Sequence, residues 1–250
     1  MSLRLLRKGA FVEETYRAFQ HWDIEASLKD NLGRLTEGQF KTAAWGREVR
    51  ATLLRRFRDY DHAKPFIRLA SSDLAVEEWR ACLLLWIGVN EPFFGDFVRD
   101  WLFVEFDQGT HSIRATAVRP FVSRFWQESE SKKPLSVYGA LRTGRDLLRM
   151  ARDFGLLAGD GPSKTLARPH LSDSSFLFWA HWIAEHEGSS SKVVKSRHWR
   201  LALMYPADVE RELLRLHQFR KVHYEVAGSL VQLSLPCASS REYAESMVAA

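Results

Sequence analysis

Cysteine and long apolar runs are both scarce in this chain of 250 residues. Its two cysteines, Cys82 and Cys237, lie far apart in sequence, and Cys82 falls in the apolar run 81–89, where we expect a buried thiol. Such sparing use of cysteine fits a reducing cytoplasm. The N-terminal sequence MSLRLLRKGAF lacks the uninterrupted apolar core of a signal peptide, and the longest apolar stretch falls short of the about 20 residues that cross a bilayer. We therefore expect a cytoplasmic protein without a membrane span.

The sequence also lacks the common motifs of catalysis and cofactor binding. The string GDGPSKT, at 159–165, comes nearest to a phosphate-binding loop, but it has Ser163 before Lys164 where that motif has glycine. Neither a G-x-G-x-x-G fingerprint nor a G-x-S-x-G elbow occurs. We therefore predict no enzyme activity, no cofactor and no small-molecule substrate. Glu105 and Asp107 leave a weaker alternative, an enzyme whose carboxylates would gather around a metal ion.

A metal site has equally little support. His181 and Glu185 are four residues apart, so they share one face of a predicted helix and could hold a metal together. Two ligands do not make a site, however, and neither a third ligand nor a cysteine pair lies nearby in sequence. We therefore interpret His181 and His186 as surface or half-buried histidines and predict no metal.

Helical patterns dominate the first half of the chain. Hydrophobic residues make up 46% of the sequence, enough for one substantial core or two modest ones. From Glu13 to about Phe106, apolar residues recur at three- and four-residue spacing, which predicts successive amphipathic helices and few strands. Thr36 with Gln39 three positions later is a capping-box pattern, and it predicts a helix from there to about Arg58.

The second half is predicted to combine helices with two short hairpins. The polar stretch 127–134 has no periodicity and indicates a connection, so we expect a helical, helix-turn-helix-like domain at 1–130 and a second domain at 131–250. A helix at 136–154 is followed by a Gly-Asp-Gly turn and an apolar return to Leu166, an order typical of a winged helix-turn-helix. The remaining expectations are a helix at 172–187, a basic loop at 189–200, a helix at 207–219, a hairpin of 223–226 with 230–235, and a loose tail after Pro236. The fold class is thus mainly α with short β-hairpins.

Basic residues are concentrated in three segments of a chain whose formal charge is +5 and whose pI is about 9.3. The window 41–58 has six basic residues against Glu48 alone, and the predicted helix 136–154 has arginines at 142, 145, 149 and 152. The third segment, 189–200, has no acidic residue at all, which suits a flexible loop that contacts phosphates. Arginines on an amphipathic helix often only keep its outer face solvated, but three such segments together favour a DNA-binding surface. The residues that we predict to contact DNA are Lys41, Arg47, Arg50, Arg55, Arg142, Arg145, Arg149, Lys164, Arg168, Lys192, Lys195 and Arg197.

Several of these segments resemble the BrxA family, small accessory proteins of BREX (bacteriophage exclusion) defence systems. The resemblance is carried by DNLGRLTEGQFKTAAWGREVRATLLRRF, by LLRMARDFGLL with its downstream PHLS, and by LMYPADVERELLRL followed by VHYEVAGSLVQLSLP. It implies a cytoplasmic DNA-binding protein with helix-turn-helix-like parts that serves a phage-resistance system. It supplies no set of functional residues.

Charge and resemblance together predict a non-enzymatic protein that binds double-stranded DNA largely through the phosphate backbone. The alternative is a protein-protein adaptor that docks onto larger BREX components, because tryptophan and arginine are also the residues that dominate protein interfaces. A contiguous positive surface would favour DNA, and a large apolar patch would favour the adaptor.

Overall fold

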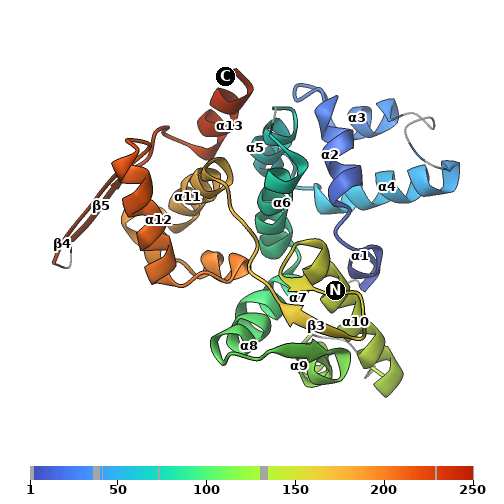
Figure 1. Ribbon diagram of the computed structural model, residues 1–250. Coiled ribbons are helices and arrows are strands. Elements are labelled where there is room, and N and C mark those ends of the chain that lie inside the picture. The colour runs from blue at the N-terminus through green and yellow to red at the C-terminus, as the bar shows by residue number, and fades with distance from the viewer. Residues whose placement is uncertain are drawn as a thin grey trace. The chain divides into compact units, whose positions relative to one another are not determined.

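The structure is a computed structural model that describes residues 3–35, 40, 42–72, 74–129, 135–228 and 230–249. Within these ranges the chain is mainly helical, as predicted, and its strands form two small antiparallel sheets (Figure 1). The predicted capping box of Thr36 and Gln39, the predicted DNA contact Lys41 and most of the 127–134 connection lie outside the described residues.

The elements group into two compact units that alternate along the chain. The first unit comprises Met1–Phe11, Ile87–His170 and Arg200–Leu203, and the second comprises Val12–Trp86, Leu171–Trp199 and Met204–Ala250. Residues on both sides of position 130 belong to the first unit, so the predicted division there does not coincide with this grouping. Whether 1–130 and 131–250 fold on their own stays a prediction.

The first unit combines short and long helices with a three-stranded sheet. The strand order is β1-β3-β2, and both pairings are antiparallel. The predicted hairpin is confirmed as β2 and β3, in which Leu157 lies opposite Leu166, whereas β1 was not predicted. The elements are α1 (Leu3–Lys8), the end of α6 (Val76–Asn90), α7 (Pro92–Asp96), the π-helix η2 (Phe97–Leu102), α8 (Phe103–Asp107), β1 (Ser112–Arg114), α9 (Ala115–Glu128), α10 (Val137–Asp153), β2 (Leu157–Ala158) and β3 (Ser163–Leu166).

Aromatic side chains fill the core of this first unit. The rings of Phe94 and Phe154 lie 5.6 Å apart between centroids, and those of Phe97 and Phe121 lie 5.8 Å apart, which joins the 92–107 helical run to α9 and α10. Gly144 lets α10 approach α9 closely, because a Cβ there would lie 3.1 Å from the carbonyl oxygen of Ala115. The position of α10 is thus fixed on its inner side by tight packing.

The second unit is helical apart from one hairpin. That hairpin is the predicted pairing of 223–226 with 230–235, now observed as β4 and β5 with Tyr224 opposite Leu233. The elements are α2 (Val12–Gln20), α3 (Leu28–Arg34), α4 (Ala43–Arg56), α5 (Tyr60–Ala70), most of α6, α11 (Asp173–Glu187), the 3₁₀ helix η3 (Ser190–Lys195), the start of the 3₁₀ helix η4 (Arg197–Ala202), α12 (Pro206–Gln218), β4 (His223–Ala227), β5 (Leu230–Ser234) and α13 (Ser240–Ala249).

Buried tryptophans hold the second unit together. The indole nitrogen of Trp179, on α11, donates a 3.1 Å hydrogen bond to the carbonyl oxygen of Ala81, on α6. The ring of Trp179 also stacks on that of Trp199 at 5.7 Å, and Phe66 of α5 meets Phe178 edge-on at 4.9 Å. As expected, Cys82 is buried.

Two expectations for the second unit were wrong. The stretch 189–200 is not a flexible loop: it forms η3 and most of η4, and it buries Val193, Val194 and Trp199. The chain after Pro236 is not loose either, because α13 occupies 240–249 and Ser240 at its start donates two hydrogen bonds to the carboxylate of Glu185, at 2.8 Å and 2.6 Å. In both places the burial of a few apolar residues orders a segment whose composition is mostly polar.

Among the described residues no single helix has the length and hydrophobicity to cross a bilayer. Helix α6 and residues 92–107 reach that length and hydrophobicity only when they are taken together, and the chain bends by 106° between them.

Candidate nucleic-acid interface

Helix α10 presents one basic face and one apolar face. Tyr138, Arg142, Arg145 and Arg149 follow each other at four-, three- and four-residue spacing, which places them on the same side of the helix. The opposite side buries Leu147 and its apolar neighbours. Ser136 caps the helix, because its hydroxyl oxygen accepts a 3.0 Å hydrogen bond from the backbone N–H of Gly139. The predicted basic helix at this place is confirmed, and its cap is a finding of the structure.

The arginines of α10 differ in how far they are already engaged. Arg142 and Arg145 are exposed, and within the described residues neither makes an ion pair. Arg149 is 42% exposed and lies 3.4 Å from the carboxylate of Asp146. Arg152 pairs with Asp160 at 2.7 Å and with Asp153 at 3.7 Å. The middle of the helix therefore carries the guanidinium groups that remain available to an anion.

The N-terminal helix adds a basic residue that the sequence did not single out. The carbonyl oxygen of Arg7 accepts a 2.7 Å hydrogen bond from Nη2 of Arg149, which ties α1 to α10. The exposed side chain of Arg7 stands in the same electrostatic neighbourhood, since burial raises the pKa of Asp146 while Arg149, Arg142 and Arg7 oppose that rise. Three arginines thus surround a single half-buried carboxyl.

The hairpin beside α10 uses its basic residues internally. The ammonium group of Lys164, on β3, donates hydrogen bonds to the carbonyl oxygens of Gly159 and Gly161, at 2.7 Å and 2.8 Å, so this lysine closes the turn of the hairpin. Arg168 is exposed, and its guanidinium lies 5.3 Å from the ring centre of Phe106. Both residues belong to the first unit together with the arginines of α10.

The other predicted contacts belong to the second unit. On α4, Arg47 and Arg55 are exposed, whereas Arg50 donates a 2.7 Å hydrogen bond to the carbonyl oxygen of Leu35. Arg56, counted in the basic window, is buried at 4% exposure and does not extend that surface. Lys192, Lys195 and Arg197 are exposed around η3 and η4, with Lys192 bonded to the carbonyl oxygen of Glu187 at 3.2 Å. Each unit therefore carries basic residues of its own.

Metal-binding groups do not gather in the part of the chain that the structure describes, where no three His, Cys, Asp or Glu side chains are placed to share an ion. His181, expected to be a surface or half-buried histidine, is instead buried at 2% exposure, and its Nε2 has no hydrogen-bond partner among the described residues. Burial lowers the pKa of His181 to about 4. The neutral imidazole is therefore part of the core, stacked on Tyr243 with 5.0 Å between ring centroids.

These features define a mainly helical protein with an arginine-lined helix beside a short antiparallel hairpin. A model of the BrxA family matches residues 2–181, and the chain belongs to that family, whose members are accessory proteins of BREX systems. Neither the curated proteins nor the solved structures gave a match.

Proposed function

We propose that the protein is a non-enzymatic, cytoplasmic BREX accessory protein that binds double-stranded DNA mainly through the phosphate backbone, with α10 as its principal contact. The observation that carries the proposal is the face of Tyr138, Arg142, Arg145 and Arg149 on one capped helix. Guanidinium groups suit phosphate oxygens, and their spacing along one side of α10 lets several meet one duplex at once. No acidic residue occupies the first turn of α10, so this end of the helix does not repel DNA.

The order of elements in the first unit supports a winged helix-turn-helix. Going along the chain, α8, β1, α9, α10, β2 and β3 follow each other, and β1 pairs with β3 at the edge of the hairpin. In a winged helix the helix before the hairpin is the one that enters the major groove, and here that helix is α10. The hairpin, closed by Lys164, would be the wing.

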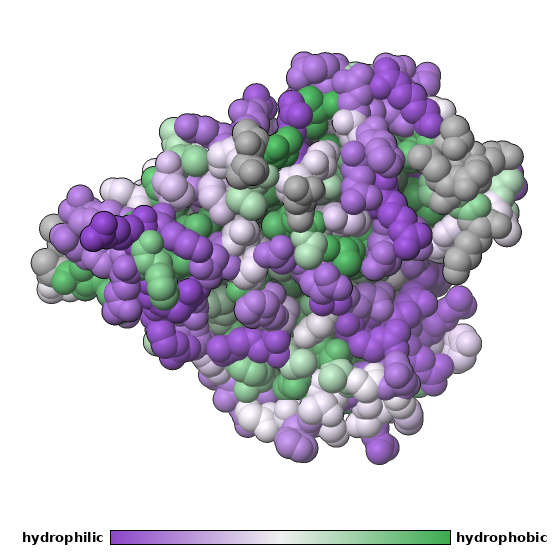
Figure 2. All heavy atoms as spheres, turned by 45° about the horizontal axis from the view of Figure 1, so that its top comes forward, coloured by the Kyte–Doolittle hydropathy of each residue, from purple (hydrophilic) through white to green (hydrophobic). Residues whose placement is uncertain are grey.

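One face of the molecule lacks the large apolar patch that a protein-protein adaptor would favour. On the face drawn in Figure 2 hydrophilic side chains prevail and hydrophobic ones form scattered small patches. Exposed apolar side chains do occur on α10 itself, where Val137 is 65% and Tyr138 is 68% exposed. An aromatic ring at the start of a groove-facing helix suits contact with sugars and base edges.

A mobility-shift or anisotropy assay with several unrelated duplexes tests the proposal. Replacing both Arg142 and Arg145 by alanine removes two charges without touching the Arg149 hydrogen bond, and we expect the affinity for every duplex to fall by about tenfold or more. The matched control removes two charges from the second unit, Arg17→Ala with Lys29→Ala, and should change affinity less than about twofold. Equal losses in the two double variants would show a general charge effect and refute a role for α10.

The adaptor function stays the second candidate. The observation in its favour is a pocket lined by α2 and by the residues that lead into α4, in the second unit.

A further inference from the structure

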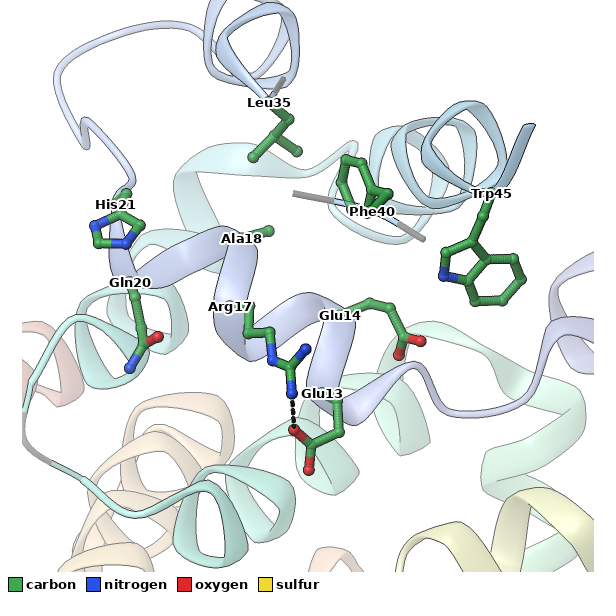
Figure 3. A pocket seen from close by; sticks show the side chains of 9 residues that line it. All are labelled: Glu13, Glu14, Arg17, Ala18, Gln20, His21, Leu35, Phe40 and Trp45. Atoms are coloured by element: carbon green, nitrogen blue, oxygen red, sulfur yellow. Dashed lines mark hydrogen bonds and ion pairs between the residues drawn. The ribbon is translucent and has the colours of Figure 1, made fainter. Parts of the chain in front are cut away.

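A small pocket opens in the second unit beside α2. It has a volume of about 280 Å³, and its walls come from α2, from the end of α3 and from the start of α4 (Figure 3). Pockets for drug-sized ligands and cofactors usually measure about 300–1,000 Å³. Its size therefore suits one large side chain rather than a nucleotide or a cofactor.

One wall of the pocket is apolar and aromatic. Ala18 and Leu35 are buried, and Phe40 and Trp45 are half-buried. Phe40 is held in place by a close approach to α4, because a Cβ added at Gly46 would lie 2.8 Å from its Cδ2 atom. This wall offers an aliphatic stem a dry surface and places the ring of Trp45 beside the acidic side of the pocket.

The other wall is acidic. Glu13 and Glu14 line it together with Arg17, and Figure 3 shows all three projecting from α2. The guanidinium of Arg17 lies 3.5 Å from the carboxylate of Glu13, so each of these two side chains neutralises the charge of the other. Within the described residues Glu14 makes no ion pair, and its half-buried carboxylate stands on the side of α2 where Trp45 lies.

We propose that this pocket binds an arginine side chain presented by a protein partner. The guanidinium would pair with the carboxylate of Glu14 and stack on Trp45, while its three-carbon stem would pack along Ala18, Leu35 and Phe40. A planar guanidinium can donate hydrogen bonds from its edge to a carboxylate while its face stacks on an aromatic ring, and it loses its hydration water more easily than an ammonium group does. The site goes beyond the DNA-binding function, since a pocket with an unpaired carboxylate repels phosphates.

Amide and indole NMR spectra of the ¹⁵N-labelled full chain, titrated with acetyl-Gly-Arg-Gly-amide, test the proposal. The indole N–H signal of Trp45 is assigned by Trp45→Phe. We expect the peptide to shift this signal and the amides of Ala18 and Leu35 with a Kd of roughly 1–10 mM, as is typical of a single side chain. The same peptide with citrulline, which has the shape of arginine without its charge, should bind at least about fivefold more weakly.

Glu14→Gln supplies the decisive variant, because it keeps the shape of the side chain and removes only the charge. We expect it to weaken arginine-peptide binding by about fivefold and to leave citrulline-peptide binding unchanged. Glu25→Gln is the matched control, since Glu25 is an exposed acid of the same unit that does not line the pocket. Equal binding of the two peptides, unchanged binding by Glu14→Gln, or no shift at Trp45 up to about 20 mM peptide would each overturn the proposal.

Discussion

The guanidinium of Arg149 donates a 2.7 Å hydrogen bond to the backbone carbonyl oxygen of Arg7, a residue 142 positions earlier in the chain. This bond connects the first helix to the helix that carries the arginine face. Arg149 therefore holds α1 against α10 in addition to supplying a positive charge, whereas Arg142 and Arg145 make no such hydrogen bond within the described residues.

Arg149→Gln should loosen α1 without disturbing the rest of α10. Losing one hydrogen bond from a charged donor to a backbone carbonyl costs about 1.5–3 kcal/mol, part of which appears as local opening of residues 3–11. Hydrogen exchange of peptides from this segment measures that opening, and we expect it to rise at least about fivefold. Arg145→Gln removes the same charge from the same face but no such bond, and it should leave exchange in α1 unchanged; equal effects of the two variants would disprove the structural role.

Salt dependence should report the number of phosphates that α10 contacts. A plot of log Kobs against log[KCl] falls with a slope of about −0.9 for each phosphate neutralised. We therefore expect Arg142→Gln and Arg145→Gln to reduce the steepness of this slope by about 0.9 each, and the double variant by about 1.8. Fluorescence anisotropy between about 50 and 300 mM KCl gives the slopes. Weaker binding with an unchanged slope would mean that these arginines do not contact phosphates.

Stability should fall below neutral pH because of His181. Its pKa is about 4 in the folded protein, since burial disfavours the imidazolium more than Glu242 favours it, and 6.5 is its ordinary value. The unfolded chain thus binds a proton between pH 6.5 and 4 where the folded chain does not, so stability is full above pH 6.5 and is lost as pH falls toward 4.

His181→Phe tests this assignment while keeping a ring against Tyr243. Urea unfolding at pH 7, 6 and 5 should show that the free energy of unfolding of the natural chain falls relative to this variant by as much as about 1.4 kcal/mol per pH unit. The two proteins differ only at position 181, so the difference between their pH profiles isolates His181. Parallel pH profiles would show that the imidazole does not carry the effect.

Two glycine substitutions should have opposite effects on stability. A Cβ at Gly95 would lie 1.9 Å from the carbonyl oxygen of Gly88, a backbone atom of α6, so Gly95→Ala forces α7 away from α6 and should cost about 3 kcal/mol or more. Among the described residues, nothing beyond the chain neighbours and the backbone of α3 lies within 4 Å of a Cβ at Gly33, and alanine there should stabilise the protein by about 0.5–1 kcal/mol. Thermal unfolding of both variants measures these effects. A loss of stability well below this figure for Gly95→Ala would show that α6 and α7 can move apart at little cost.

Local patterns in the sequence were enough to predict α10, α11 and both hairpins. Ser136 and Ser172 cap the two helices, with hydroxyl oxygens that accept hydrogen bonds from the backbone N–H groups of Gly139 and Ser175, and Gly188 ends α11 in the left-handed conformation. These features depend on a few neighbouring residues. The sequence therefore carries their signal directly.

Elements that depend on distant partners were missed. Strand β1 has three residues, and its pairing with β3 joins segments about 50 positions apart, so no pattern of neighbouring residues predicts this strand. The same applies to the candidate interface. Composition marked Arg50 and Lys164 as basic, but their bonds to Leu35 and to the glycine turn follow from the folded chain, and the nearness of Arg7 to α10 follows only from long-range packing.

The alternation of the two units along the chain also bears on how the protein is made. The first unit takes its opening segment from Met1–Phe11 and its last from Arg200–Leu203, where the guanidinium of Arg200 lies 4.8 Å from the ring centre of Phe103. A ribosome adding about 5–20 residues per second needs roughly 7 to 28 seconds to go from Arg7 to Arg149. During that interval the newly made α1 exists without the helix on which it packs. The order of its segments along the chain therefore delays completion of the first unit until Arg200–Leu203 has been made.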